Sequence, residues 1–123
     1  MSEEKSIAIF VTVTVLGMLI LSNRASAAVY TVGDAAGWNF NVAGWENGKH
    51  FRAGDVLVFN YIPAAHNVVS VDRRAYNSCT TPKGAKVYQS GRDRIRLVRG
   101  QNCFICNFPG HCQSGMKIAI NAM

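Results

Sequence analysis

Beyond residue 27, the chain alternates short hydrophobic runs with clusters of Gly, Asn, Asp and Pro. Runs rich in β-branched and aromatic residues that end at such clusters are typical of β-strands joined by turns. Asp72 is placed to cap a short helical turn that ends near Cys79. The strands expected from the pattern cover residues 29–32, 56–61, 68–71, 87–88, 94–98, 102–106 and 117–120.

This spacing predicts an all-β fold, an antiparallel β-sandwich of about seven or eight strands with Greek-key connections. The near-continuous hydrophobic segment 56–61 is typical of a strand that lies between two layers. The segment 33–45 has too many Gly and Asn residues for a regular element. It contains Trp38, Phe40 and Trp45, which we expect to be buried at one end of the core.

Residues 1–27 have a different pattern, which is typical of a secretion signal. An apolar run, Ile7–Leu21, follows Lys5 and precedes Ala25-Ser26-Ala27, a small-x-small cleavage pattern. The run is shorter than the roughly 20 residues that span a bilayer. We therefore expect residues 1–27 to be a cleaved signal peptide and residues 28–123 to form one secreted domain. An uncleaved anchor is the alternative.

The basic composition favours acidic partners. The chain carries a formal net charge of +6, and residues 1–27 contribute nothing to it because their two acidic and two basic residues cancel. In the extracellular space, cell wall or matrix, the expected partners are acidic proteins and acidic polysaccharide, bound less tightly as salt rises. Nucleic acid is not expected, because Arg94 and Arg96 alternate with Ile95 and Leu97 as on the wet face of a strand.

The segment from Cys103 to Met116 gathers most of the potential metal ligands. Cys106, His111 and Met116 have the spacing Cys-x4-His-x4-Met, which fits a thiolate, an imidazole and a weak thioether around copper. A second imidazole is missing from this loop. Alternatively, Cys103, Cys106 and His111 match three ligands of a zinc knuckle, but the neutral Met116 stands where the fourth thiolate is required.

His66 can supply the second imidazole. It lies at the edge of a different strand, so only a folded two-layer structure can bring it to the loop. Asn67 follows it directly, and its side chain could tie the His66 strand to the ligand loop. Hydrogen bonds around the ligands of a copper ion tune its reduction potential. His50 stands in a polar stretch and is expected to be a surface histidine.

The chain resembles the phytocyanins of plants and, within that family, the plantacyanins. The resemblance covers essentially all of residues 28–123, and its most specific segments are His66–Val68 and Asn107–Met116. Gly37-Trp38 and Phe51–Phe59 are also shared. The family implies a cupredoxin fold with one type 1 copper ion. The ligands that it implies are His66, Cys106, His111 and an axial Met116, together with a disulfide between Cys79 and Cys112.

Two positions are informative within the family. Met116 is the residue type that plantacyanins have at this position, whereas stellacyanins have Gln there. Cys103 departs from the family, which usually carries an aromatic residue at this position. Residues three apart on a strand face opposite sides, so Cys103 is expected to be a buried free thiol rather than a ligand beside Cys106. A bridge from Cys103 to Cys79 or to another chain is the alternative.

These features predict a one-electron carrier that cycles between Cu(II) and Cu(I), as a soluble monomer with no membrane anchor. The expected redox partner is an acidic protein or a small phenolic. An enzyme is not expected, because blue-copper oxidases need several His-x-His pairs and this chain has three His. By resemblance to plantacyanins, the alternative is an extracellular-matrix signalling or cell-guidance protein in which copper redox is secondary.

Overall fold

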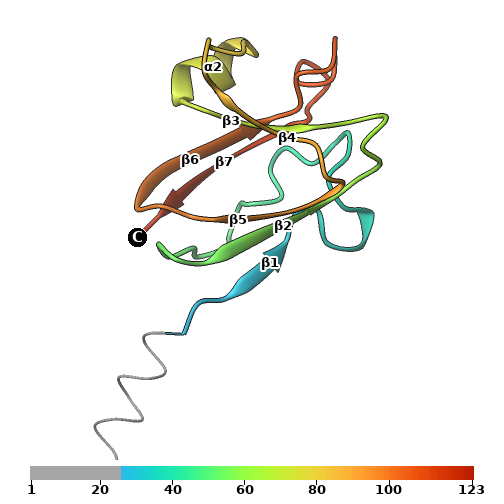
Figure 1. The fold of residues 1–123 in the computed structure, drawn as a ribbon. Helices are drawn as coiled ribbons and strands as arrows, with labels where there is room; N and C mark the ends of the chain where they lie inside the picture. Colours follow the sequence, from blue (N-terminus) through green and yellow to red (C-terminus); the bar gives the residue numbers. More distant parts are fainter. Residues whose placement is uncertain (1–25) are drawn as a thin grey trace, which may run out of the picture.

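The structure is a computed structural model that describes residues 26–123, so the expected signal peptide lies almost entirely outside the described residues. Within them, seven strands form two sheets that lie one above the other (Figure 1). This arrangement confirms the predicted β-sandwich. The elements are β1 (Val29–Thr31), the 3-10 turn η1 (Asp34–Ala36), β2 (Val56–Asn60), β3 (Val68–Val71), α2 (Arg73–Ser78), β4 (Lys86–Tyr88), β5 (Arg92–Arg96), β6 (Gly100–Ile105) and β7 (Lys117–Ala122).

One sheet has the strand order β1-β2-β5 and the other has the order β4-β3-β6-β7. Neighbouring strands are antiparallel except for β1 and β2, which pair in parallel with Val29 opposite Val56. The sequence pattern predicted antiparallel strands, so this pair is a correction. Parallel neighbours need a long connection, and residues 32–55 provide it.

Strand β5 also differs from its predicted bounds of 94–98. It begins at Arg92 because it pairs with the whole of β2, Arg92 lying opposite Asn60 and Arg96 opposite Val56. It ends early because the Val98 N–H donates to the Asn102 side chain at 3.0 Å, which turns the chain toward β6. Exposed and buried residues alternate along β5, so the predicted wet face of arginines is confirmed.

The core lies between the two sheets. Phe59 and Phe104 face each other across it, with ring centroids 5.2 Å apart, and Trp38 packs edge-on against Phe59 at 5.1 Å. Trp38 is buried as expected, but Phe40 is 42% exposed, which corrects the expectation that it would be buried. Trp45 is partly buried.

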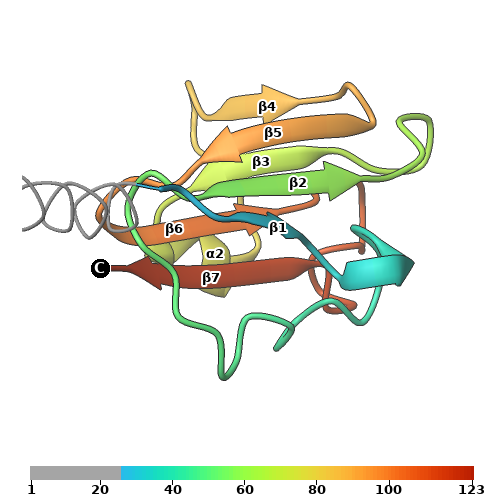
Figure 2. The ribbon, with the colours of Figure 1, turned by 90° about the horizontal axis from the view of Figure 1, so that it is seen from below.

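The long segment between β1 and β2 runs beside β7, the last strand of its sheet (Figure 2). The Ala119 N–H on this strand donates to the Glu46 carboxylate at 2.9 Å, and the Ala43 N–H donates to the Gly115 carbonyl at 3.1 Å. An open strand edge invites pairing with another chain. Here Glu46 accepts a hydrogen bond from one N–H group of this edge, and the bond from Ala43 to Gly115 brings the segment close to the ligand loop.

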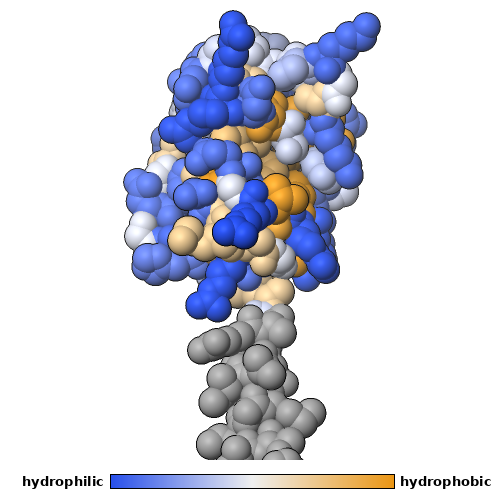
Figure 3. All heavy atoms as spheres, turned by 90° about the vertical axis from the view of Figure 1, so that its left-hand side faces the viewer, coloured by the Kyte–Doolittle hydropathy of each residue, from blue (hydrophilic) through white to orange (hydrophobic). Residues whose placement is uncertain are grey.

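Helix α2 covers the outer face of the four-stranded sheet. The Asp72 side chain accepts a hydrogen bond from the Ala75 N–H at 2.9 Å, which confirms the predicted N-cap. Cys103 is free and almost fully buried, as expected. Within residues 26–123, no helix has the length and hydrophobicity to cross a membrane. The side of the molecule where the C-terminus lies is mostly hydrophilic (Figure 3).

Candidate metal centre

Strand register brings His66 and Cys106 together. Strands β3 and β6 are antiparallel, with Val69 opposite Ile105. Because pairing positions in an antiparallel ladder sum to a constant, the residues just before β3 lie beside those just after β6. His66 is held there by a turn in which its N–H donates to the Ile62 carbonyl at 3.1 Å. Two segments distant in sequence thus meet at one end of the sheet.

The loop between β6 and β7 folds back on itself and returns Met116 to Cys106. The Cys106 N–H donates to the Met116 carbonyl at 3.1 Å, and the Met116 N–H donates to the His111 carbonyl at 3.1 Å. Gly115 permits the reversal, because its φ of 99° lies in a region that residues with a Cβ rarely adopt. Three of the predicted ligands are therefore joined by backbone hydrogen bonds.

The side chains of His66, Cys106 and His111 converge on one point. The two Nδ1 atoms lie 3.1 Å apart, and the Cys106 Sγ lies 3.5 Å from the His111 Nδ1. All three donor atoms lie within 4.8 Å of one another. Met116 is fully buried in the same core cluster as Cys106. Among residues 26–123, this is the cluster of His, Cys, Asp or Glu side chains that could hold a metal ion.

The donor set fits a soft first-row metal. Two ring nitrogens that face each other at 3.1 Å need either a proton or a cation between them, because both carry a lone pair when unprotonated. At metal–nitrogen distances of about 2.0–2.1 Å, two nitrogens on one ion would lie about 3.0–3.6 Å apart, depending on the angle at the metal. The observed separation matches that requirement, and thiolate with imidazole is a donor set that suits copper.

Burial prepares His66 for this role. The side chain is 9% exposed. Desolvation by burial lowers the pKa of His66 below its ordinary value, and the neighbouring His111 lowers it further. A lower pKa favours the neutral imidazole, which is the form that binds metals.

Asn67 connects the His66 strand to the ligand loop. Its Nδ2 donates to the Asn107 Oδ1 at 2.6 Å, and its Oδ1 accepts from the Asn107 N–H at 3.0 Å. The Trp38 Nε1–H donates to the Asn67 carbonyl at 2.8 Å. Asn107 also donates to the Thr81 hydroxyl at 3.2 Å. The residues next to His66 and Cys106 are thus bound to each other directly.

The disulfide implied by the resemblance is present. Cys79 follows α2 and is bonded to Cys112, which lies beside His111 in the ligand loop. The bridge joins residues 33 apart in sequence. It leaves Cys103 and Cys106 as the free cysteines of the described chain, and Cys103 is not in the donor cluster. The zinc-knuckle interpretation requires Cys103 there, so the geometry does not favour it.

Sequence analysis missed the contacts of Phe40. Its ring centroid lies 5.3 Å from the His66 ring and 4.7 Å from the His111 ring. The sequence offered no signal for this contact, because Phe40 lies in an irregular segment far from both histidines. His50 is exposed at the surface, as expected.

Comparison with known proteins agrees with this geometry. The family model for the plastocyanin-like domain matches residues 34–116. A basic blue protein of Arabidopsis thaliana is 60% identical over 116 residues, covering 94% of this chain and 90% of that protein. The similarity therefore extends over almost the whole length of both chains.

Solved structures show the same relationship. The structure of cucumber basic protein, a blue copper protein, has a TM-score of 0.78 and 64% identity, covering 78% of this chain and all of that one. Spinach plantacyanin has a TM-score of 0.71 and 64% identity, with the same coverage. With its two-layer fold and its His-Cys-His cluster, the chain belongs to the phytocyanin family of plastocyanin-like blue copper proteins, in the plantacyanin or basic blue protein subfamily.

Proposed function

We propose that this protein carries single electrons by means of one type 1 copper ion held by His66, Cys106, His111 and Met116. The observation that carries the proposal is the convergence of one cysteine sulfur and two imidazole nitrogens within 4.8 Å. Two imidazoles, one thiolate and a weak thioether are the donors of blue-copper electron-transfer sites. Membership of the blue copper proteins supports the same metal.

Each ligand has a separate task in this proposal. Copper, when bound, supplies the Cu(II)/Cu(I) couple. Cys106 is fully buried, so its thiolate is shielded from water and from other thiols. His66 and His111 bind as neutral imidazoles, and the partly exposed His111 offers a partner a short path to the centre. Met116 closes the site from the core side.

Rigidity of the site supports electron transfer over substrate chemistry. The Cys79–Cys112 bridge and the Asn67–Asn107 hydrogen bonds hold the ligand loop from two sides. Donors held in a fixed arrangement that suits both copper oxidation states need little movement when an electron is gained or lost. We therefore propose a carrier rather than an enzyme.

The test is the visible spectrum of the purified protein after addition of Cu(II). An intense band in the red that disappears in Cys106→Ser is expected from a thiolate–copper bond. Cys103→Ser is the matched control, since Cys103 is the second free cysteine and lies on β6, three residues before Cys106 and outside the cluster. This control should keep the band.

Other results would contradict the proposal. No red band with Cu(II), together with tight zinc binding that depends on Cys103, would restore the zinc-knuckle interpretation. Oxygen uptake during turnover of a phenol would instead indicate an oxidase.

We also propose that residues 1–27 are a signal peptide and that the domain is secreted. The Ala28 backbone nitrogen donates to the buried Asp55 carboxylate at 3.0 Å. Cleavage after Ala27 would turn this nitrogen into a charged amino group beside that carboxylate, which strengthens the bond. Amino-terminal sequencing of the exported protein should begin at Ala28, and a longer amino terminus would contradict the proposed boundary.

A matrix-interaction role is the second candidate, because Arg92, Arg94 and Arg96 form an exposed row on β5. Such a row fits an acidic polysaccharide through charge attraction. His66→Ala separates the two candidates. Full biological activity of the variant without copper would favour the matrix role. If the variant loses both the red band and the biological activity, electron transfer is favoured.

A further inference from the structure

We propose that Phe40 is a positioning residue of the metal centre, which holds the His66 and His111 rings in their metal-binding orientation and shields them from water. This inference rests on the proposed copper site. The three rings form a closed group, because the two imidazoles also contact each other, with centroids 5.1 Å apart. Phe40 meets His66 at 82° and His111 at 65°, both edge-to-face arrangements.

Hydrogen bonds on both sides hold Phe40 over the centre. On one side, Trp38 donates from its backbone N–H to the Asn60 carbonyl at 2.9 Å and from its indole to the Asn67 carbonyl at 2.8 Å. On the other side, the Ala43 N–H donates to the Gly115 carbonyl at 3.1 Å. Asn67 is next to His66, and Gly115 is next to Met116. The segment that carries Phe40 is therefore bound to the neighbours of two proposed ligands.

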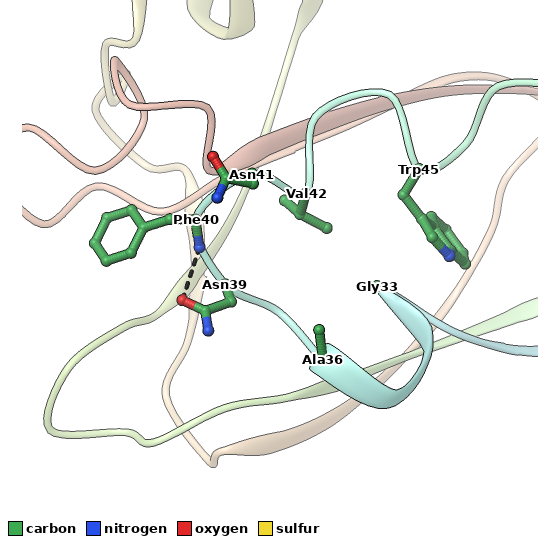
Figure 4. Close-up of a pocket in the computed structure, with 8 residues that line it drawn as sticks. Gly33, Ala36, Asn39, Phe40, Asn41, Val42 and Trp45 are labelled. Carbon is green, nitrogen blue, oxygen red and sulfur yellow. Dashed lines mark hydrogen bonds between the residues drawn. The ribbon is translucent and has the colours of Figure 1, made fainter.

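The local backbone directs the ring outward from its own segment. The Phe40 N–H donates to the Asn39 side chain at 2.8 Å, and Asn41 has a left-handed φ of 67°. Figure 4 shows the Phe40 ring pointing away from Ala36 and Trp45, which line a groove with it. Phe40 is thus packed against the histidines rather than inserted into the core.

The exposed position of Phe40 allows an experiment to distinguish a positioning role at the metal centre from a purely structural role in the fold. Because Phe40 is 42% exposed and lies beside an open groove, truncation should leave no closed cavity in the core and should change the unfolding temperature little. Edge-to-face ring contacts favour one ring orientation, and an apolar ring excludes water from the imidazole edges. Truncation should therefore act mainly at the metal centre.

The experiment compares Phe40→Ala and Phe40→Leu with the wild-type protein. Ile62→Ala is the matched control, since the Ile62 side chain is exposed and the substitution keeps the backbone carbonyl that accepts from the His66 N–H. Copper release to a chelator should be roughly three- to tenfold faster in Phe40→Ala, the range that the loss of one aromatic contact predicts. Phe40→Leu should be intermediate, because leucine shields the rings but offers no aromatic face. Ile62→Ala should match the wild type.

A second measurement uses the metal-free proteins, so that it does not depend on copper. Crystal structures should show a single His111 ring orientation in the wild type and in Ile62→Ala, and a rotated or divided orientation in Phe40→Ala. If Phe40→Ala fails to fold, the same two comparisons are made with Phe40→Leu, which keeps the apolar volume and should still release copper faster than the wild type.

The outcomes distinguish this inference from the proposed function. A wild type without the red band would overturn the copper proposal, while the metal-free structures would still decide whether Phe40 orients the rings. A wild type with the band would support the copper site. Unchanged copper release and an unchanged His111 orientation in the folded Phe40 variants would then overturn the positioning role alone.

Discussion

Asn67 shows how one side chain can join two parts of the centre. It is 4% exposed and bonds Asn107 through both ends of its amide group. Asn107 is exposed, so its amide can bind water once Asn67 is removed. Each of the two hydrogen bonds then counts only its net contribution of about 0.5–1.5 kcal/mol, and the loss of both should still be measurable in stability and at the metal.

Asn67→Ala should therefore lower the free energy of unfolding by about 1–3 kcal/mol. It should also weaken copper binding by roughly 10–100-fold, as is usual when an outer partner of a ligand is lost, and shift the reduction potential. Urea unfolding and chelator competition measure these effects. Asn121→Ala, at an exposed position on β7, is the control. Unchanged affinity and potential in Asn67→Ala would mean that the amide does not influence the site.

Cys103 provides a pH test at the same scale. Desolvation by burial raises the pKa of the Cys103 thiol above its ordinary value. Above about pH 8.5, the thiol of the unfolded chain loses its proton while the folded one keeps it. The unfolded state then binds fewer protons, so stability falls as pH rises toward the folded-state pKa.

The metal-free wild type should consequently lose stability between pH 8.5 and 10 more steeply than Cys103→Ala. The difference in slope should be on the order of 1 kcal/mol per pH unit. Urea unfolding of both proteins across this range measures it. Equal slopes would show that Cys103 ionises as easily in the folded protein as in the unfolded chain.

At the scale of elements, the ligand loop depends on its attachment to the segment after α2. The bridge from Cys79 to Cys112 closes a separation of 33 residues. Closing a loop of this length restricts the unfolded chain and typically adds about 2–4 kcal/mol. The bridge also holds the residue beside His111 in place.

Replacing both Cys79 and Cys112 with Ser should lower the free energy of unfolding by about 2–4 kcal/mol and weaken copper binding, because the loop loses its covalent anchor. Thermal unfolding with and without copper measures both effects. Cys103→Ser, which leaves the bridge intact, controls for the loss of a cysteine. Stability equal to that of the wild type would indicate that packing alone holds the loop.

At the scale of the whole molecule, positive charge should raise the rate of association with negatively charged partners. The chain carries a formal net charge of +6, and the Arg92, Arg94 and Arg96 side chains are exposed on one face of β5. Surface charge of one sign raises the association rate with partners of the opposite sign, and salt screens the effect.

The rate of electron exchange with an anionic metal complex should therefore fall several-fold as ionic strength rises from about 0.01 to 0.15 M, over which the Debye length drops from about 30 to 8 Å. Changing Arg92, Arg94 and Arg96 together to Gln should flatten this dependence. Stopped-flow kinetics measures it, and a cationic complex should show the opposite trend. A rate that does not respond to salt would exclude charge steering.

Features that depend on nearby residues were predictable from the sequence. The wet face of β5, the Asp72 cap and the spacing of Cys106, His111 and Met116 all come from neighbours within a few positions. Alternating polarity and local hydrogen bonds act over that range, so these patterns keep their meaning without knowledge of the fold. The family resemblance added the Cys79–Cys112 pairing, which spacing alone left open.

Other features arose only when distant segments packed together. The β3–β6 register brings His66 to Cys106, the parallel pairing of β1 with β2 follows from the path of residues 32–55, and Phe40 reaches both histidines from that same segment. Such contacts depend on the combined packing of two sheets and a long connection, which no local pattern encodes. The sequence thus determined the donors and most of the strands, and the folded structure determined which side chains surround them.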